Sequence, residues 1–532
     1  MRPHFALLIT LAACHQSVDE GVLDALPEAL IGVPNLDDDD GDGNRDAWQD
    51  DLLDDDDLSS LALPAELVEG VNKRTALNLT LSGSGIRVYH GGAVVMDDET
   101  ATWRFPPDQE GEAELLVEFT DYHQTGSLTL ELLKLKDDSA LGSRTVALGS
   151  APFQMNHHLQ AAEHLYVMQL NGWDMSNASM IAGLTEVVGE DNLTVIPSGG
   201  YQQDVWIQDE LEFGHLVGMD TEMNMVLDSI RCSNGDCLDD VPEDYLQGPG
   251  TALDTYGRKL YTNSLDSFGN LECSPPVTVD GVSYPFGRIY FGGSPSYHPA
   301  EELFGVLVDQ RVQAPLQPDS TWLCVGHVDE YMAFLPDPAS PKGFRFAITD
   351  VDAAYAFLEG LDPESALPKY TSTHGYATVG ELLDDQALRA LNEDAQADYV
   401  DPTVALFKAE LGLEESDIIR LPLLFEDAGP WCDHTAIALM PGLVNLAVWN
   451  PEGGGTHLLI PDPFFRSDLA DQSTDPLIAA FDALMPAGSE THYLDDWDVY
   501  HEMMGEVHCG TNIRRAPAGD WWTEAAHLME VE

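Results

Sequence analysis

The sequence is poor in basic residues, and this shortage limits the partners it can have. Its 532 residues include 23 Lys and Arg against 93 Asp and Glu, which gives a formal net charge of -70 at pH 7. Nucleic acids and anionic lipid headgroups are polyanions, so we expect the chain to bind no nucleic acid and no bare lipid surface. The acidic excess suits a solvated or calcium-rich surface that attracts cationic partners. Conferring solubility alone is the alternative role.

The chain also has no apolar run of the length that a mature transmembrane helix needs. An apolar stretch over residues 5–13 follows a short basic start, and Cys14 comes next. These features, with small residues before the expected cleavage position, are typical of an export signal. The Cys makes residues 1–14 resemble a bacterial lipoprotein signal peptide. We therefore expect an acylated Cys14 and an exported cell-envelope lipoprotein that meets the membrane only through its lipid anchor. The ordinary signal peptide of a secreted protein is the alternative.

Cysteine is scarce as well, with seven residues in the chain. Setting aside Cys14 leaves six in a compartment where disulfides can form. Cys232 and Cys237 flank a turn-like Ser-Asn-Gly-Asp sequence, which predicts a disulfide between them. No second Cys pair or His pair has a spacing that indicates a zinc site. We expect three others to be small buried residues, namely Cys273, Cys324 and Cys432.

Residues 15–62 form an acidic segment with few aromatic residues, for which we predict a linker. Within it, alternate carboxylates precede a Gly at the sixth position of a loop, a spacing that can wrap a calcium ion. Position twelve of that loop is Gln49, where a bidentate Glu is expected. The segment is therefore a possible second metal region, and a disordered acidic spacer is the alternative. Its candidate ligands are Asp38, Asp40, Asp42 and Asp46.

Hydrophobic patterning divides the rest of the chain into two regions. Between residues 63 and 145, short runs alternate apolar and polar residues with turn signals between them, which predicts a small β-sandwich. Over residues 146–532, buried-strand patterns alternate with helical ones, as at 165–170, 175–188 and 193–196. That alternation predicts an α/β region large enough for a catalytic domain.

Three segments of the α/β region stand apart because each combines polar groups that can act in catalysis. The first offers a Trp with three acids, the second a His-x-Asp sequence, and the third a Cys between His and Gly. These segments are Trp206–Glu212, Val325–Glu330 and Gly505–Asn512.

Together these groups suit attack on the planar carbon of a guanidinium. The thiolate of Cys509 is the nucleophile. Asp209 and Asp329 can each bind one edge of the cation, because a guanidinium presents its N–H donors in a fixed fork. Trp206 can stack on the cation or on its alkyl stem. His327 can give a proton to the leaving nitrogen and then activate the water that hydrolyses the covalent thiouronium.

These segments resemble those of the protein-arginine deiminases, within the guanidino-group-modifying superfamily. The resemblance extends in one continuous order over residues 150–525. Further matching stretches are Leu265–Val279, Val312–Pro315, Leu411–Ile419 and Val507–Arg515. It implies a five-bladed α/β propeller with the site at its centre, preceded by a small immunoglobulin-like β-sandwich.

The resemblance gives the residues named above their roles. Cys509 would be the nucleophile and His327 the general acid and base. Asp209 and Asp329 would hold the guanidinium, and Trp206 would wall the pocket. His508, beside the nucleophile, would be a structural or orienting residue.

The resemblance also implies Ca²⁺ as the cofactor. One ion would bind Gln208, Glu212 and Glu272 with the backbone oxygens of Phe268 and Leu271, and a second would bind Glu210, Asp228 and the carbonyl of Ser229. All of these are hard oxygen ligands, which suit calcium. Alternate side chains of an extended segment project to opposite sides, so we expect the acids beside Asp209 to face away from the substrate. The alternative is that these acids are solvated surface charge.

The sequence departs from the family pattern at several positions. Cys232 stands where the second calcium site has an Asn. Arg231 matches the first of two arginines that hold the substrate's backbone carbonyls, but Ser233 occupies the second place. Met503 and Met504 replace an Arg and a His before the nucleophile motif. These departures put recognition of a peptide backbone in doubt.

We therefore predict an enzyme, a calcium-dependent hydrolase of C–N bonds in linear amidines. It would convert peptidyl arginine to citrulline and ammonia, with arginine-containing proteins or peptides as partners. One alternative is a deiminase of free arginine, agmatine or another small guanidine. An alternative of another class is an inactive calcium-binding surface lipoprotein.

Overall fold

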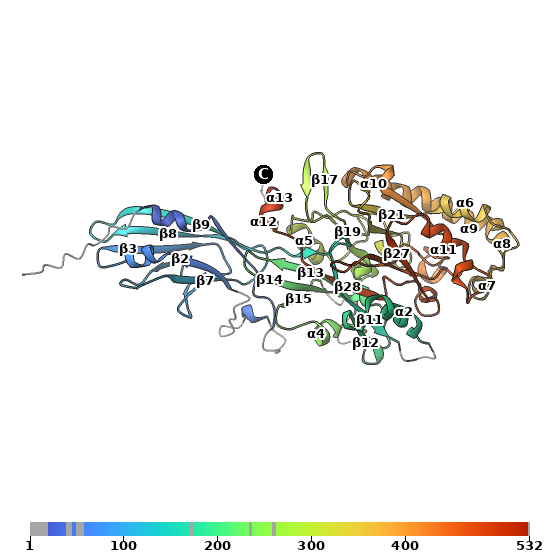
Figure 1. The fold of residues 1–532 in the computed structure, drawn as a ribbon, viewed down its shortest axis with the longest axis horizontal. Coiled ribbons are helices and arrows are strands. Elements are labelled where there is room, and N and C mark those ends of the chain that lie inside the picture. The colour runs from blue at the N-terminus through green and yellow to red at the C-terminus, as the bar shows by residue number, and fades with distance from the viewer. Residues whose placement is uncertain are drawn as a thin grey trace, which may run out of the picture. The chain divides into compact units, whose positions relative to one another are not determined.

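The computed structural model describes most of the chain and divides into two units (Figure 1). The described residues are 20–38, 45–48, 58–170, 172, 175–232, 237–257 and 262–529. Unit 1 draws on residues 1–35, 46–151 and 218–221, and unit 2 on residues 36–45, 152–217 and 222–532. No helix among the described residues is long and apolar enough to cross a membrane.

Unit 1 consists of two sheets that share one hydrophobic core. The sheets have the strand orders β1-β9-β8-β3-β6 and β2-β7-β4-β5. In β3 the buried side chains include Leu77, Leu79 and Leu81, which agrees with the period of two in the sequence. The elements of unit 1 are β1 (Ala29–Gly32), β2 (Leu58–Leu63), α1 (Ala65–Gly70), β3 (Thr75–Ser82), β4 (Ile86–His90), β5 (Ala93–Met96), β6 (Thr102–Arg104), β7 (Ala113–Phe119), β8 (Thr125–Lys134) and β9 (Ser139–Ser150).

The boundaries of unit 1 differ from those expected for the β-sandwich. Part of the predicted linker belongs to its sheets, because β1 pairs in parallel with β9 and β2 pairs antiparallel with β7. Both short strands bury leucines, among them Leu30, Leu61 and Leu63, in the shared core. The acidic composition of residues 15–62 concealed these apolar positions. The predicted export segment with Cys14 lies outside the described residues.

Unit 2 repeats one strand arrangement. In four groups, a first strand pairs antiparallel with a second, and the second pairs in parallel with a third. A fifth group has the antiparallel pair β16 and β19, with a parallel bridge from Tyr290 to Leu316 in place of the third strand. The complete groups are β28-β11-β12, β13-β14-β15, β20-β21-β22 and β25-β26-β27.

The first of these groups joins the two ends of unit 2, because β28 comes from the C-terminal region and β11 from the beginning. The strands of unit 2 are β10 (Gln154–Met155), β11 (Ala162–Gln169), β12 (Leu193–Pro197), β13 (Leu211–Val217), β14 (Glu222–Asp228), β15 (Thr251–Thr255), β16 (Leu271–Cys273), β17 (Val277–Val279), β18 (Val282–Tyr284), β19 (Ile289–Phe291), β20 (Met332–Pro336), β21 (Phe344–Asp350), β22 (Ile418–Pro422), β23 (Phe425–Asp427), β24 (Ala436–Ala438), β25 (Ala447–Trp449), β26 (Thr456–Pro461), β27 (Ser489–Leu494) and β28 (Thr511–Arg515).

Helices connect the second and third strands of these groups. One of them, α6, begins where Asp350 accepts a hydrogen bond from the backbone N–H of Ala353, and it buries Val351, Ala354 and Leu358. The helices are α2 (Ala178–Val188), α3 (Ile207–Glu210), α4 (Val241–Tyr245), α5 (Glu301–Asp309), α6 (Val351–Glu359), α7 (Pro368–Thr373), α8 (Val379–Asp384), α9 (Gln386–Ala395), α10 (Asp401–Glu410), α11 (Pro476–Asp482), α12 (Trp521–Glu524) and α13 (Ala526–Met529). The mixture agrees with the predicted α/β class.

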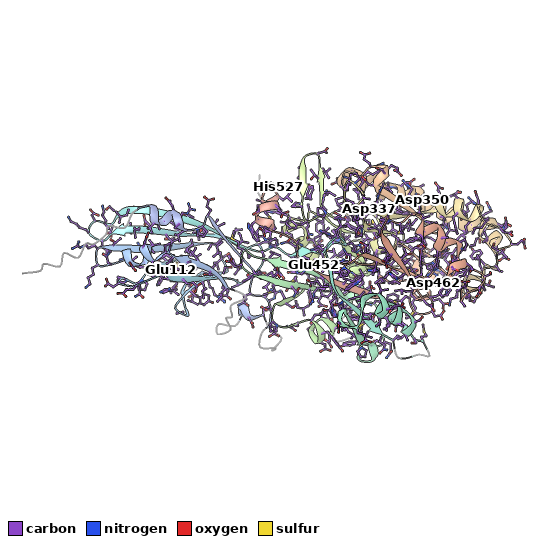
Figure 2. The ribbon with its side chains drawn as sticks, viewed as in Figure 1. Glu112, Asp337, Asp350, Glu452, Asp462 and His527 are labelled. Atoms are coloured by element: carbon purple, nitrogen blue, oxygen red, sulfur yellow. A yellow bond between two sulfur atoms is a disulfide. The ribbon has the colours of Figure 1, made fainter. Side chains whose placement is uncertain are left out.

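Several of the few arginines of unit 2 pair with buried aspartates. A desolvated carboxylate needs a charged or hydrogen-bonding partner, so these cations are used where burial makes them most necessary. The N···O distances are 2.7 Å for Arg345 with Asp337, 2.8 Å for Arg420 with Asp350 and 2.6 Å for Arg466 with Asp462 (Figure 2).

Two disulfides are present among the described residues. The predicted pair Cys232–Cys237 forms one. Cys324 and Cys432 form the other, so the prediction that these two are small buried residues was wrong. They are 108 residues apart in the sequence, and the fold brings them together. Cys273 is buried and unbridged, as expected.

Candidate active site

The site lies where the first strands of the five groups begin. Asp209 precedes β13 by two residues, Gly269 precedes β16 by two, and Asp329 precedes β20 by three. Asn445 precedes β25 by two, and Cys509 precedes β28 by two. The equivalent junction of each group therefore contributes one residue to a common location.

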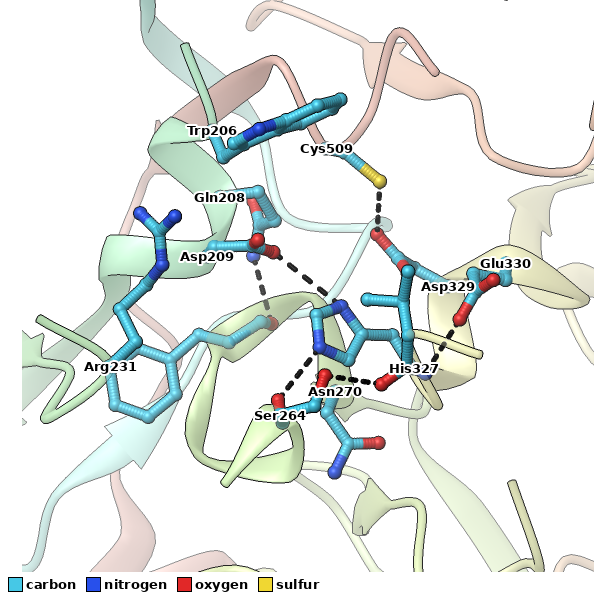
Figure 3. A network of polar contacts seen from close by, with 12 residues as sticks. Trp206, Gln208, Asp209, Arg231, Ser264, Asn270, His327, Asp329, Glu330 and Cys509 are labelled. Atoms are coloured by element: carbon cyan, nitrogen blue, oxygen red, sulfur yellow. Dashed lines mark hydrogen bonds and ion pairs between the residues drawn. The ribbon is translucent and has the colours of Figure 1, made fainter. Parts of the chain in front are cut away.

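A cavity of about 270 Å³ at this location is lined by Trp206, Asp209, His327 and Cys509. Asp329 is not part of the lining but lies beside the nucleophile, with its Oδ2 3.4 Å from Sγ of Cys509 (Figure 3). The structure thus brings together all five residues predicted for catalysis and for the pocket wall. Other lining residues are Arg231, Ser264, Ser267, Val325, Glu330, Met503, Met504 and Gly505.

His327 has a hydrogen-bond acceptor on each side of its ring. Nε2 lies 2.9 Å from the carbonyl oxygen of Ser264, which can only accept, so Nε2 carries a proton. Nδ1 lies 3.5 Å from Oδ1 of Asp209. Glu330 accepts a hydrogen bond of 2.8 Å from the backbone N–H of His327 and fixes the turn. Two acceptors suit an imidazolium, which has two N–H donors and can act as an acid.

Asp209 and Asp329 present carboxylate oxygens that the described residues leave unsatisfied. Oδ1 of each is buried and accepts no hydrogen bond within the described residues. Nδ1 of His327, at 3.5 Å from Oδ1 of Asp209, makes only a longer ion-pair contact. Burial raises the pKa of Asp209, and the nearby His327 lowers it. Two buried acceptors without donors are costly unless a cationic group with several N–H donors binds between them.

Gly269 leaves the space in which these groups meet. A Cβ at this position would lie 2.6 Å from Nδ1 of His327, 2.9 Å from Oδ1 of Asp209 and 3.2 Å from Oδ2 of Asp329. A side chain here would displace at least one of the three. The same reasoning applies to Gly505, where a Cβ would lie 2.3 Å from the ring of Trp206.

Asn445 holds the nucleophile, and the sequence analysis missed it. Its Nδ2 donates to Sγ of Cys509 at 3.1 Å, and its Oδ1 accepts from the backbone N–H of Cys509 at 3.3 Å. Burial raises the pKa of the Cys509 thiol well above its usual range, and the carboxylates of Asp329 and Asp209 raise it further. Asn445 opposes this effect. A polar residue inside the apolar run 443–449 was the available signal.

On its far side, the Cys509 turn contacts a second polar cluster. Nδ1 of His508 lies 3.0 Å from Oδ2 of Asp329, and Nε2 lies 3.3 Å from Oε1 of Glu272. Burial lowers the pKa of His508, but the two carboxylates outweigh it, so the net shift is upward. His508 therefore links the residue beside the nucleophile to a predicted calcium ligand.

Three predicted ligands of the first calcium site line a small cavity of about 30 Å³ behind this histidine. They are Gln208, Glu212 and Glu272. The two carboxylates are each 8% exposed. Burial raises the pKa of Glu212 well above its usual range, and the nearby Glu272 raises it further. Burial also raises the pKa of Glu272, to about 7, and Asp329 adds to this increase. Gln208 donates to Glu212 at 2.9 Å and to the carbonyl oxygen of Phe268 at 3.3 Å. Two buried acids with amide and carbonyl oxygens make a donor set that fits Ca²⁺.

The local backbone differs from the extended segment that was expected. Ile207–Glu210 is the one-turn helix α3, and only Leu211 onward is a strand. Successive side chains of a helix are separated by about 100°, so three neighbours can point in three directions. Asp209 faces His327, Gln208 faces the small cavity behind His508, and Glu210 faces Arg231. The divergence of these side chains was predicted, but for the wrong geometric reason.

The residues predicted for the second calcium site lie around Glu210. Oε2 of Glu210 is 3.1 Å from Nη1 of Arg231, and Oε1 is buried without a hydrogen bond within the described residues. Burial and the nearby Asp228 raise the pKa of Glu210 to about 8, although Arg231 lowers it. The backbone N–H of Ser229 donates to the carbonyl oxygen of Glu210 at 2.8 Å. Leu271, predicted for the first site, begins β16 beside Glu272.

Arg231, predicted to contact substrate, forms ion pairs within the protein. Besides Glu210 it pairs with Asp204 at 2.9 Å. These carboxylates outweigh burial and raise the pKa of Arg231 further. It still lines the cavity that contains Cys509. Asp204, which also accepts from the backbone N–H of Trp206 at 2.9 Å, carried no motif that would have identified it.

The possible metal region near the N-terminus is only partly described. Asp40 and Asp42 lie outside the described residues. Asp38 is buried in unit 2 and accepts a hydrogen bond of 3.1 Å from Gln247. Asp46 is buried in unit 1. Calcium binding there stays a prediction.

Comparison with known proteins identifies one family. Residues 140–523 match the sequence model of the protein-arginine deiminase (PAD) family. Protein-arginine deiminase type-4 of Rattus norvegicus is 34% identical over 400 residues, and type-1 of Homo sapiens is 34% identical over 390 residues. Each alignment covers 71% of this chain and 56% of the relative, so the chain spans little more than half the length of these relatives.

Among solved structures, WR4, a C.elegans MSP family member, aligns with a TM-score of 0.13 and 11% identity over 24% of this chain and 94% of that chain. That similarity is too low to bear on the fold.

Proposed function

This chain belongs to the protein-arginine deiminase family, and we propose on that basis that it hydrolyses the guanidinium of peptidyl arginine to citrulline and ammonia. The observation that carries the proposal is that Cys509 and Asp209 line one cavity, with Asp329 directly beside the sulfur. The sulfur lies 3.4 Å from the Asp329 carboxylate, and each carboxylate has a buried oxygen that accepts no hydrogen bond among the described residues. A planar cation with N–H groups on two edges is the ligand that such a cavity favours.

The first half of the proposed reaction forms a covalent bond to sulfur. Asp209 and Asp329 bind the guanidinium, and Trp206 covers its face. The arriving positive charge offsets the two carboxylates that hold the Cys509 thiol protonated, so the thiol releases its proton to solvent in the complex. The thiolate attacks the central carbon. His327 then gives its proton to one nitrogen, which leaves as ammonia and produces a thiouronium on Cys509.

The second half releases the product. A water molecule enters the place of the lost ammonia, and the neutral His327 takes one of its protons as the oxygen attacks the same carbon. The carbon–sulfur bond breaks and returns the electron pair to Cys509, and the remaining hydroxyl proton passes through solvent to the released ammonia. His327 is again protonated and Cys509 is again a thiolate, so the net change is guanidinium plus water to a urea group plus ammonium. Asn445 orients the sulfur throughout through its contacts with the side chain and backbone of Cys509.

We also propose that Ca²⁺ is required. Gln208, Glu212 and Glu272 would hold one ion, and Glu210 and Asp228 a second, with the backbone oxygens named above. When bound, the ions supply positive charge that keeps these buried carboxylates ionised. At Glu210 a cation would compete with Arg231, and this competition would free the arginine to contact a substrate carbonyl. The donor sets support this proposal.

The five-bladed propeller and the immunoglobulin-like character of unit 1 belong to the same proposal. The five strand groups of unit 2, and the pairing of C-terminal β28 with β11, support a propeller closed by its last strand. Two sheets with one core support the second assignment. We propose export as well, which two disulfides support, whereas a lipid at Cys14 stays a prediction.

One experiment tests the proposed activity. Citrulline formation is measured from a blocked peptidyl arginine and from free arginine, each with Ca²⁺ and with chelator. We expect turnover of the blocked substrate that depends on calcium. Turnover of free arginine alone would replace the proposal by a small-guanidine deiminase. That second candidate is favoured by one observation, the ion pairs that hold Arg231 away from a substrate backbone.

Absence of turnover on every guanidine, by a folded protein that still binds calcium, would support the inactive surface lipoprotein.

A further inference from the structure

A cluster of two histidines and a glutamate lies on the last strand group of unit 2, outside the candidate active site. β26 and β27 pair in parallel, with His457 opposite Glu490 and Leu459 opposite His492. Residues paired across a sheet share a face, as do residues two apart on one strand. All three polar side chains therefore lie on the same face of the sheet. Figure 1 labels β27 and α2, the strand and helix of this part of unit 2.

The distances among their ligand atoms approach those of a tetrahedral metal site. Nδ1 of His457 lies 3.1 Å from Nε2 of His492 and 3.7 Å from Oε2 of Glu490. One ligand atom from each residue lies within 4.8 Å of the others. With bonds of about 2.0–2.1 Å, a tetrahedral zinc ion holds its ligands about 3.3 Å apart. The two measured contacts lie on either side of that value.

The neighbouring helix covers this face. Leu459 and Leu494, on the same face, belong to one core cluster with Leu184 of α2. The three polar residues lie toward solvent from this core, because His457 and His492 are half-buried and Glu490 is exposed.

We propose that His457, Glu490 and His492 bind a transition-metal dication, for which Zn²⁺ has the fitting geometry, with water as the fourth ligand. Imidazole nitrogens select zinc, copper or nickel, whereas calcium prefers an all-oxygen set. This site is therefore chemically distinct from the proposed calcium sites. A bound ion would tie β26 to β27.

The contrary interpretation is a hydrogen bond between two neutral imidazoles with an exposed carboxylate nearby. Calorimetric titration of Zn²⁺ into chelator-treated protein separates the two interpretations. The titration is done in excess Ca²⁺. Every protein, including the parent, carries Cys509→Ser, so that the nucleophilic thiol does not compete for Zn²⁺. His457→Asn and His492→Ala are compared with this parent. His434→Ala is the matched control, because His434 pairs with Asp427 at 2.9 Å without a second histidine in the contact.

We expect the parent and His434→Ala to bind Zn²⁺ equally at this site. His457→Asn and His492→Ala should each lose one equivalent, or bind it more than about 100-fold more weakly. The thermal midpoint should rise with Zn²⁺ in the parent and not in these two variants, which also verifies that they fold. Equal stoichiometry and affinity in all four proteins, or no binding by the parent, would overturn the proposal.

Discussion

The two sides of the Cys509 turn contain similar charged groups but differ in how these groups are satisfied. The cavity side has Asp209 and His327 in the lining of a space of about 270 Å³, with Asp329 beside it at the sulfur of Cys509. The far side has Glu212, Glu272 and His508 around a small space of about 30 Å³. A space of the first size admits an organic cation, whereas the second admits only an ion or a water molecule.

This difference suits the two kinds of cation proposed above. On both sides burial raises the pKa of carboxylates, so each side is costly without a positive charge. Asp329 belongs to both sides, because the same oxygen contacts Cys509 and His508. We infer that a metal on the far side would fix the position of Asp329 before substrate arrives on the other.

The largest expected effect comes from removing the sulfur on the cavity side. Cys509→Ser should lower kcat by at least about 10⁴-fold, because a hydroxyl of pKa far above that of a thiol cannot form the covalent intermediate. Binding of blocked peptidyl arginine, measured by calorimetry, should remain within tenfold. A variant that retained a tenth of the turnover would exclude Cys509 as the nucleophile.

A smaller effect is expected from Asn445, which contacts the turn itself. Asn445→Asp places a carboxylate where an amide donates to Sγ, and therefore raises the thiol pKa further. We expect kcat near neutral pH to fall by about 10²-fold and to recover partly at higher pH. The pH profile of kcat measures this, with Asn78→Asp on β3 of unit 1 as the matched control. An unshifted profile would mean that Asn445 serves only to hold the backbone.

On the far side, Glu272→Gln should alter the calcium requirement before it alters chemistry. Loss of one charged ligand should raise the Ca²⁺ concentration for half-maximal activity by about 10- to 100-fold, while kcat at saturating Ca²⁺ stays within tenfold. Citrulline formation over a calcium series checks this, with Glu452→Gln as the matched control. Glu452, labelled in Figure 2, is exposed and lines neither cavity. An unchanged calcium series would remove Glu272 from the ligand set.

The smallest expected effect concerns His215, which contacts Arg515 in the lining of the small cavity. Nε2 of His215 donates to the carbonyl oxygen of Arg515 at 2.7 Å. Burial lowers the pKa of His215 to about 4 from its usual 6.5. Below pH 6.5 the unfolded chain takes up a proton that the folded chain resists, so this residue lowers the free energy of unfolding as pH falls toward 4. The loss is at most about 3 kcal/mol.

His215→Gln keeps a donor but does not titrate. Urea unfolding of both proteins at pH 7 and pH 4.5, without calcium, should therefore show a smaller acid-induced loss in the variant. Identical losses would mean that His215 protonates freely in the folded protein.

Much of the site could be predicted from three short segments, and the reasons are chemical. A Cys between His and Gly, a His-x-Asp sequence and a Trp beside acids each indicated a role, and the fold places these residues around one cavity. Asn445 could not be found this way, because an amide in an apolar run has no distinctive pattern. Asp204 and Ser264 were missed for the same reason, since each acts through a contact that only folding creates.

The fold, like the site, was predictable from the sequence in part. Period-two runs predicted the strands of unit 1, and alternating patterns predicted the α/β class of unit 2. The short strands β1 and β2 escaped notice because acidic residues dominate the composition around them. The bridge between Cys324 and Cys432 escaped it because sequence spacing contains no information on distance across 108 residues.

By itself the sequence determined which chemistry the chain can perform, because reactive side-chain types and their close neighbours are properties of the linear order. Only the tertiary structure decided which of these groups meet. It places the starts of five strand groups at one point. It pairs some buried carboxylates with arginines and leaves others without a positively charged partner among the described residues. Burial then sets the cost of each bare charge, and so determines which cation each side of the turn can accept.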